Sequence, residues 1–411
     1  MFLSRRSIAK LGQKCTDARN GIRDLVHKME IVLPDDQIAW GQFLDDGRNK
    51  RQFGVLGTSA AIQVLSSMGT AATSVQRAQQ TLPYLSVSES PKCQHELNDR
   101  TSTFKVLAAL DAYEPTTKKF DSQVAYPLAA NYLLNAQIEN EGWGNYFRSD
   151  ADRDDKSAVE PTALTLIALH RFGRCIADER CTKALDWLSG ELEPRQTESP
   201  AADALGVLAF SKFEGSESKS ERVSLAHQNC VVRLSQWRKT PRDIAFHSEY
   251  HYEIPDGFGG GESKYIFFPV AILVALALLK SQYSKSSDRT WAARVCQEVA
   301  ARVRRDGGFR VWGHVSTVDQ CWANQLLLEC EELVKSRPSD LLPPPLNRIQ
   351  SRMAKWTTLG ATLVSGLLGA YWAIVSHSAT FRILGSALTA VSFGFFVALI
   401  MAWYAKGDRS H

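Results

Sequence analysis

The 411-residue chain lacks an excess of charge of either sign. Its 48 lysines and arginines nearly balance its 44 aspartates and glutamates, and the net charge is only +4. Nucleic-acid-binding domains usually concentrate basic residues on one surface, whereas acids and bases are mixed along this chain. We therefore expect no direct contact with nucleic acid.

Cysteine pairs are also lacking. The eight cysteines are scattered, and neither a CxxC pair nor a zinc-finger spacing occurs among them. Because intracellular thiols are kept reduced, we expect free cysteines in a cytoplasmic body.

Fingerprints of nucleotide and hydrolase sites are absent as well. The sequence has no P-loop, no GxSxG, no HExxH and no dinucleotide-binding motif. The glycine-rich run at 257–261 lacks a predicted strand before it, so we interpret it as the turn of a repeat. The first fifteen residues hold no apolar stretch long enough for a signal peptide, and we expect the body not to be exported.

Two long uncharged apolar runs are present near the C-terminus, at residues 357–376 and 383–404. About twenty helical residues span the roughly 30 Å hydrocarbon core of a bilayer, and a helix satisfies its own backbone groups there. We predict a two-span transmembrane hairpin. Two buried helices of a soluble core are the alternative.

Basic residues flank these runs unequally. Arg348, Arg352 and Lys355 precede the first run, whereas the connecting turn carries only Arg382. Positive residues favour the cytoplasmic side, so we expect a multi-pass protein of the inner membrane with a cytoplasmic body. Small residues recur in the runs at four-residue spacing and favour close packing within or between protomers. They are Ser365, Gly369, Gly385, Thr389, Gly394 and Ala398.

A proline-rich stretch at 336–348 marks the end of the body. Its four prolines cannot continue a helix and favour an extended spacer. The predicted organisation is an N-terminal helical segment (1–49), a helical domain (50–335), a linker (336–356), the hairpin (357–404) and a cytoplasmic tail (405–411).

The body repeats one pattern, in which a turn rich in glycine and aromatic residues precedes an apolar helix. Six such helices are expected, within 53–69, 102–113, 158–173, 200–210, 256–279 and 305–329. Repeats of this length suit helical hairpins that bury their apolar faces against their neighbours. Several of the helices are apolar all round, which indicates burial on every side. We predict an all-α fold, a closed α/α toroid of about six hairpins, with an open solenoid as the alternative.

Gln137, Gly142 and Trp143 carry a resemblance to a known group of toroids, and so does Asp306-Gly307-Gly308-Phe309 with Trp312. The pattern resembles the Gln-Trp motif of terpenoid cyclases and protein prenyltransferases, over roughly residues 50–335. In that family a glutamine closes an outer helix and a Gly-Trp turn precedes the next inner helix. The resemblance implies the toroid fold and, as one functional alternative, prenyl transfer or terpenoid cyclisation on isoprenoid substrates.

Terpenoid cyclases protonate an alkene with an Asp-x-Asp-Asp motif, and the string at 152–155 (DRDD) matches it literally. In the family the acids directly precede a Thr-Ala pair that opens an inner helix. That pair is Thr162-Ala163 here, so the string lies about six residues too early and we interpret it as a solvated loop. Glu160 occupies a matching position and is a candidate catalytic carboxylate.

The segment Val318-Asp319-Gln320-Cys321-Trp322 is similar to the zinc-binding context of prenyltransferases. The resemblance implies that Asp319 and Cys321 are catalytic metal ligands, with zinc as the cofactor. The third ligand is not found at its family position. The histidines weighed for that role are His247 and His251 at helical i, i+4 spacing, His314, His377 and His411.

Glu160, Asp203 and Asp319 come early on three expected inner helices. Carboxylates are favoured there by the helix dipole, and we also hypothesise that they form one acidic mouth of a central cavity. Asp203, Trp143 and Trp322 are the candidate ligand-binding residues of that cavity.

Three functions follow from these features. The first is a recognition domain that binds an apolar or isoprenoid ligand, or a protein partner or second copy, and acts on a two-span membrane module. Its architecture resembles that of bacterial membrane-acting effectors of antiphage or toxin type. The second is a membrane-tethered isoprenoid enzyme, and the third is a scaffold for a partner protein.

Overall fold

The chain divides into two compact units, Met1–Pro343 and Pro344–His411. The computed structural model describes residues 5–44, 53–67, 72–81, 107, 133–138, 141–144, 157–171, 178–193, 199–214, 220–238, 246, 248–255, 263–311, 313–341, 371 and 374. In the second unit this covers only Tyr371 and Ile374, which are helical and have exposed side chains. The division between the units lies inside the proline-rich stretch 336–348.

In the part of the first unit that the structure describes, five mainly apolar helices form the interior, and we call them the inner helices. Within α10 every residue from Val270 to Leu279 is buried, as expected for a helix that is apolar all round. The inner helices are α2 (Val55–Ser66), α6 (Val159–Arg171), α8 (Pro200–Lys212), α10 (Val270–Lys280) and α12 (Thr317–Ser336).

Five further helices, the outer helices, cover the inner ones. Helix α9 shows their pattern, because its buried residues recur every three or four positions. Its outer face is mainly polar, although Leu225 and Val232 are exposed on it. Helix α7 packs on α6, α9 on α8, α11 on α10, α3 on α2, and α1 on both α12 and α2. The outer helices are α1 (Arg5–Lys28), α3 (Ala72–Thr81), α7 (Glu179–Leu192), α9 (Glu221–Trp237) and α11 (Ser286–Asp306).

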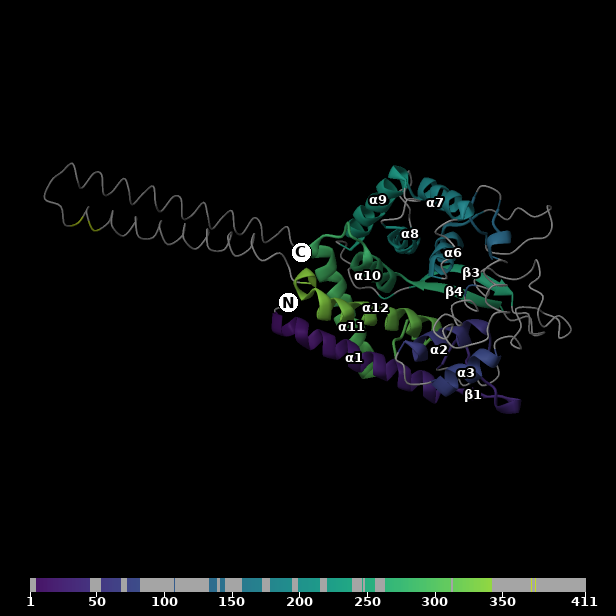
Figure 1. The fold of residues 1–411 in the computed structure, drawn as a ribbon. Helices are drawn as coiled ribbons and strands as arrows, with labels where there is room; N and C mark the ends of the chain where they lie inside the picture. The colour runs from purple at the N-terminus through teal and green to yellow at the C-terminus, as the bar shows by residue number, and fades with distance from the viewer. Residues whose placement is uncertain are drawn as a thin grey trace. The chain divides into compact units, whose positions relative to one another are not determined.

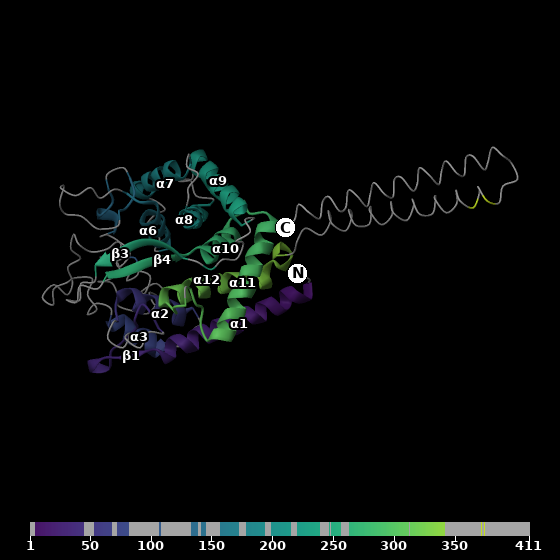
Figure 2. The same cartoon turned by 180° about the vertical axis from the view of Figure 1, so that it is seen from behind.

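The inner helices pack in the order α6, α8, α10, α12, α2, each against the next (Figures 1 and 2). Between α2 and α6 the chain is described only at α3, Leu107 and a few residues near Trp143. The mainly helical fold is therefore confirmed, whereas closure of the ring stays a prediction. Helix α1 belongs to the same unit and also contacts α11.

Local signals in the sequence explain where several helices begin and end. The hydroxyls of Ser199, Ser220 and Ser316 each accept a hydrogen bond from a backbone N–H in the first turn of α8, α9 and α12. Helix α11 ends at Gly307, whose φ of 70° suits glycine.

Two small antiparallel β-hairpins are present that the all-α prediction missed. Strand β3 (Ser248–Pro255) pairs with β4 (Ser263–Pro269), and the short β1 (Ile31–Val32) pairs with β2 (Ile38–Ala39). Tyrosine, isoleucine and phenylalanine favour a strand in 263–269, and Pro269 ends it directly before α10. A strand does precede the glycine-rich run at 257–261, contrary to our expectation. The helical spacing assumed for His247 and His251 is wrong, because His251 lies in β3.

The thiol prediction is only partly correct. Among the described residues, the buried thiols Cys15, Cys230, Cys296, Cys321 and Cys330 are free. Cys181 instead forms a disulfide.

In the part of the chain that the structure describes, no helix combines the length and the apolar character needed to cross a membrane. The two predicted spans lie outside the described residues, apart from Tyr371 and Ile374.

Candidate ligand-binding cavity

The inner helices surround a cavity of about 670 Å³ in the first unit. Its volume is within the range of small-molecule sites, roughly 300 to 1,000 Å³. Residues of all five inner helices contribute to the wall, together with Leu107 and Phe268. The apolar part of the wall consists of Leu56, Ala60, Leu107, Leu164, Ile167, Ala168, Leu208, Phe268, Leu276, Val318, Trp322 and Leu328.

Charged residues line the cavity where the inner helices end. Arg171, Lys212 and Lys280 are the last residues of α6, α8 and α10, where the helix dipole favours a positive charge. Helix α12 supplies Glu329 and Glu332 to the same lining. Lys280 Nζ lies 2.5 Å from Glu329 Oε2, so the charged end carries both signs.

The cavity lining also contains an uncharged polar group. Gln63 of α2 and Gln325 of α12, which we call the amide pair, are joined by a 3.2 Å hydrogen bond from Gln325 Nε2 to Gln63 Oε1. The Cys321 thiol donates to the same Gln63 oxygen at 3.3 Å, and Gln325 Nε2 also lies 3.5 Å from Cys321 Sγ. These contacts connect α2 and α12 across the cavity wall.

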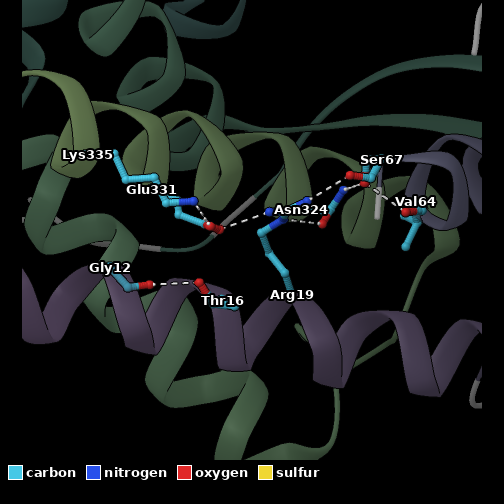
Figure 3. A network of polar contacts seen from close by, with 8 residues as sticks. All are labelled: Gly12, Thr16, Arg19, Val64, Ser67, Asn324, Glu331 and Lys335. Carbon is cyan, nitrogen blue, oxygen red and sulfur yellow. Dashed lines mark hydrogen bonds and ion pairs between the residues drawn. The ribbon is translucent and has the colours of Figure 1, made fainter. Parts of the chain in front are cut away.

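A buried polar network supports this wall from behind (Figure 3). The Arg19 guanidinium of α1 donates to Asn324 Oδ1 at 3.1 Å, to Glu331 Oε2 at 2.9 Å and to the Ser67 carbonyl at 3.2 Å. Asn324 Nδ2 in turn donates to Ser67 Oγ at 2.8 Å. Asn324 and Ser67 also line the cavity, so α1, α2 and α12 are fixed to one another at this side.

Two of the predicted site residues lie in the cavity lining. Cys321 and Trp322 follow one another on α12, and both contribute to the wall. Cys321 is 6% exposed and is held by the amide pair. The candidate catalytic thiol therefore does face the chamber.

Asp319 is buried and does not belong to the cavity lining. Its backbone N–H is bound by the Ser316 hydroxyl at the start of α12. Burial away from water raises the pKa of its carboxyl from 3.8 to about 7, because desolvation disfavours the ionised form. Asp319 thus keeps its proton over much of the neutral and acidic range.

The structure does not place the three predicted carboxylates in the lining of this cavity. Asp203 accepts two hydrogen bonds from Arg233 of α9, at 2.7 and 2.9 Å, and so faces an outer helix. Glu160, Asp319 and Asp203 are the second, third and fourth residues of their helices. Each step along a helix turns the side chain by about 100°, so these positions face different directions.

Trp143 is fully buried and also lies outside the cavity lining. Its indole donates to the Leu133 carbonyl at 2.6 Å, and its backbone N–H donates to Thr162 Oγ1 at 2.8 Å. Gln137 donates to the Glu141 and Arg180 carbonyls. These residues join an outer segment, a turn and the start of α6, which is a structural role.

The same arrangement occurs at Trp40, which the sequence reasoning missed. The Trp40 indole donates to the Val26 carbonyl at 2.7 Å, and its backbone N–H donates to Thr58 Oγ1 at 3.1 Å. Threonine follows tryptophan by 18 residues here and by 19 at Trp143. A Trp-Gly pair followed by threonine 18 or 19 residues after the tryptophan is therefore the sequence signal that could have identified α1 as the outer helix of a repeat.

Among the described residues, no group of three histidine, cysteine, aspartate or glutamate side chains is arranged to hold a metal ion. His314 is exposed beside the Phe43 ring. His247, His377, His411, the side chain of His251 and the acidic string at 152–155 lie outside the described residues. The predicted zinc site at Asp319 and Cys321 thus has no third ligand in the described part of the chain.

No protein-family model matches the chain, and no curated protein matches it significantly. The resemblance to terpenoid cyclases and prenyltransferases therefore stays a prediction from the motifs.

Proposed function

We propose that the helical body binds an apolar, isoprenoid-sized ligand in the central cavity and that residues 357–376 and 383–404 anchor it to the inner membrane. The observation that carries this proposal is the 670 Å³ cavity with a mainly apolar wall built by all five inner helices. Apolar molecules of this size partition into lipid because they are poorly soluble in water. A membrane anchor keeps the cavity close to that source.

Recognition is favoured over catalysis by the positions of the candidate residues. Of the three candidate catalytic residues, only Cys321 lies in the cavity lining, whereas Glu160 and Asp319 do not. The cavity therefore offers one thiol and neutral amides to a bound molecule, beside charged groups at the end of the helices.

Helix α12 is the element through which a bound ligand acts on the rest of the chain. One side of α12, between Val318 and Glu332, lines the cavity, and the helix is followed by the 3-10 helix η4 (Pro338–Leu341), which packs on α1, α11 and α12. The linker to the first apolar run continues from there. A ligand that shifts α12 thus acts on the segment that leads to the predicted spans, as in a membrane-acting effector.

The experiment is to purify the full chain in detergent and identify co-purifying molecules by organic extraction and mass spectrometry. Ala60→Phe and Ala168→Phe place a ring into the cavity, and we expect at least a tenfold loss of bound ligand. Ala301→Phe, on the exposed face of α11, is the matched control and should retain the ligand.

Circular dichroism shows whether the two variants keep the fold, because overpacking a core destabilises it. A wild-type chain that carries no apolar molecule and takes up none from a lipid extract would contradict the proposal. Equal ligand content in the wild type and in both folded cavity variants would do the same.

A further inference from the structure

We infer that the ligand is a lipid alcohol, an apolar skeleton that ends in an uncharged hydroxyl, and that Gln63, Gln325 and Ser66 bind this hydroxyl. This inference rests on the proposed function and specifies the chemical class of the ligand.

The amide pair leaves hydrogen-bonding groups unused inside the cavity. Gln63 Oε1 accepts from Cys321 and Gln325, and Gln325 Nε2 donates to Gln63 and Cys321. Among the described residues nothing bonds Gln63 Nε2 or Gln325 Oε1. One side-chain amide therefore presents a donor and its neighbour presents an acceptor. Exchanging oxygen and nitrogen in both amides keeps one donor and one acceptor.

Ser66 adds a third unused group. Its hydroxyl oxygen is buried and has no hydrogen-bond partner among the described residues, and Ser66 lines the cavity. It follows Gln63 by three positions on α2, a spacing that puts both side chains on one face of the helix. Buried hydroxyls are nearly always hydrogen-bonded in proteins, and because Ser66 belongs to the cavity lining, a ligand hydroxyl is able to supply its partner.

The pattern of donors and acceptors selects a hydroxyl. A hydroxyl has one donor and two acceptor sites, so it donates to the free amide oxygen and accepts from the free amide N–H group and from Ser66. A phosphate or carboxylate anion only accepts. Such an anion would satisfy the amide N–H group but would face the free amide oxygen without a proton to share.

The charges at the end of the cavity also disfavour a highly charged ligand. Three cations, Arg171, Lys212 and Lys280, stand with two acids, Glu329 and Glu332, which leaves 3 − 2 = +1. Lys280 is already paired with Glu329. The described charges at this end of the lining are therefore nearly balanced, so they do not form the strongly positive site that a diphosphate would need.

The test compares three ligands that share one C20 isoprenoid skeleton and differ only at the end: an alcohol, a diphosphate and a hydrocarbon without a polar group. Binding to the full chain in nanodiscs is measured with radiolabelled compounds. We expect the alcohol to bind at least tenfold more tightly than either of the others, because a site built for a hydroxyl discriminates against analogues that lack it.

The double variant Gln63→Leu/Gln325→Leu removes both amides together, so neither amide remains without its hydrogen-bond partner. We expect at least a tenfold loss of affinity for the alcohol and less than a twofold change for the hydrocarbon. Gln76→Leu, at an exposed position of α3, is the matched control and should bind all three ligands as the wild type does. Ser66→Ala changes a smaller group and should weaken alcohol binding severalfold.

The inference is overturned if the diphosphate binds more tightly than the alcohol, if the alcohol and the hydrocarbon bind equally, or if the double variant binds the alcohol normally. In the first two cases an apolar ligand still binds, so the proposed function survives. If no ligand of the three binds to the wild type, both proposals fail. If the double variant also fails to bind the hydrocarbon, the test passes to Ser66→Ala. Unchanged alcohol binding by Ser66→Ala then overturns the inference.

Discussion

Adjacent residues at the start of α12 serve different purposes. Cys321 and Trp322 face the cavity, Asp319 is buried outside its lining, and the Gln320 side chain bonds the backbone N–H and carbonyl of Phe309. The zinc-like string Val318–Trp322 is therefore accounted for by helix capping, turn support and cavity lining. Burial raises the pKa of the Asp319 carboxyl in this string to about 7.

This shift makes a prediction about stability. The Asp319 carboxyl ionises near pH 3.9 in an unfolded chain but keeps its proton up to about pH 7 in the folded one. The stability that the protonated Asp319 carboxyl contributes is fully present below pH 4. It is lost as the pH rises to 7, because between these two pH values only the unfolded state releases the proton. Since one pKa unit corresponds to about 1.4 kcal/mol, the loss is on the order of 3 to 4 kcal/mol.

Asp319→Asn removes the titrating group, so its free energy of unfolding should exceed that of the wild type at pH 8 and match it near pH 3.5, below the unfolded-state pKa. Denaturant unfolding at both pH values measures this difference. Asp24→Asn, at an exposed residue of α1, should follow the wild type at both. If Asp319→Asn and the wild type differ equally at the two pH values, Asp319 does not retain its proton.

At the scale of elements, one hydrogen bond that links an inner helix to the turn before it recurs at the same helical position. Thr58, Thr162 and Gln320 are each the fourth residue of an inner helix, and each bonds the backbone of an aromatic residue in the preceding turn. The aromatic residues are Trp40, Trp143 and Phe309. One side chain at a fixed helical position thus sets how each turn meets its inner helix.

Two threonines of α6 allow a matched test of this joint. Thr162 and Thr165 are both fully buried, but only Thr162 bonds Trp143, whereas Thr165 Oγ1 has no hydrogen-bond partner among the described residues. Thr162→Val should lower the free energy of unfolding by about 1 to 3 kcal/mol, because it leaves a buried backbone N–H unpaired.

Thr165→Val replaces the unbonded hydroxyl with a methyl group and should be neutral or stabilising. Urea denaturation of both variants beside the wild type gives the comparison. Equal losses of stability in the two variants would show that the bond to Trp143 contributes nothing beyond packing.

The sequence was sufficient to predict the buried helices, but it was insufficient to predict the directions in which individual side chains point. The long apolar runs of α8 and α10 predicted buried inner helices, and the residues 201–210 and 270–279 are indeed buried. The carboxylates of Glu160 and Asp203 were grouped because both come early in a helix, yet a shift of two positions turns a side chain by about 200°. The β3–β4 hairpin was missed because seven-residue apolar strands and helix starts look alike without long-range partners.

At the scale of the whole molecule, the chain combines a helical unit with a second unit that begins at Pro344. The first apolar run starts 16 residues after Leu341 (357 − 341). A linker of that length reaches at most about 55 Å when fully extended. The length of the chain alone therefore limits how far the start of the first run can lie from Leu341.

The membrane prediction is tested on the full chain. We expect it to remain in the membrane pellet after alkaline carbonate extraction, because two apolar runs of about twenty residues insert stably. Leu368→Arg with Phe395→Arg adds a charge to the middle of each run at a cost of about 2.5 to 3.5 kcal/mol per arginine, and this variant should move towards the supernatant.

The same pair of chains addresses the effector hypothesis. Expression of the wild type, but not of the arginine variant, should lower the bacterial membrane potential reported by a voltage-sensitive dye. Release of the wild-type chain by carbonate would contradict the predicted spans. An unchanged potential with a membrane-bound wild type would contradict the effector activity alone.

The network around Arg19 also governs when the body can be completed during synthesis. Arg19 and its partner Glu331 are separated by 312 positions in the chain. At about 5 to 20 residues per second, a ribosome needs on the order of 15 to 60 s to add that stretch. Throughout this time the nascent first helix exposes the apolar stripe that later meets α12. The early part of the chain therefore lacks its α12 packing partner until that helix has been synthesised.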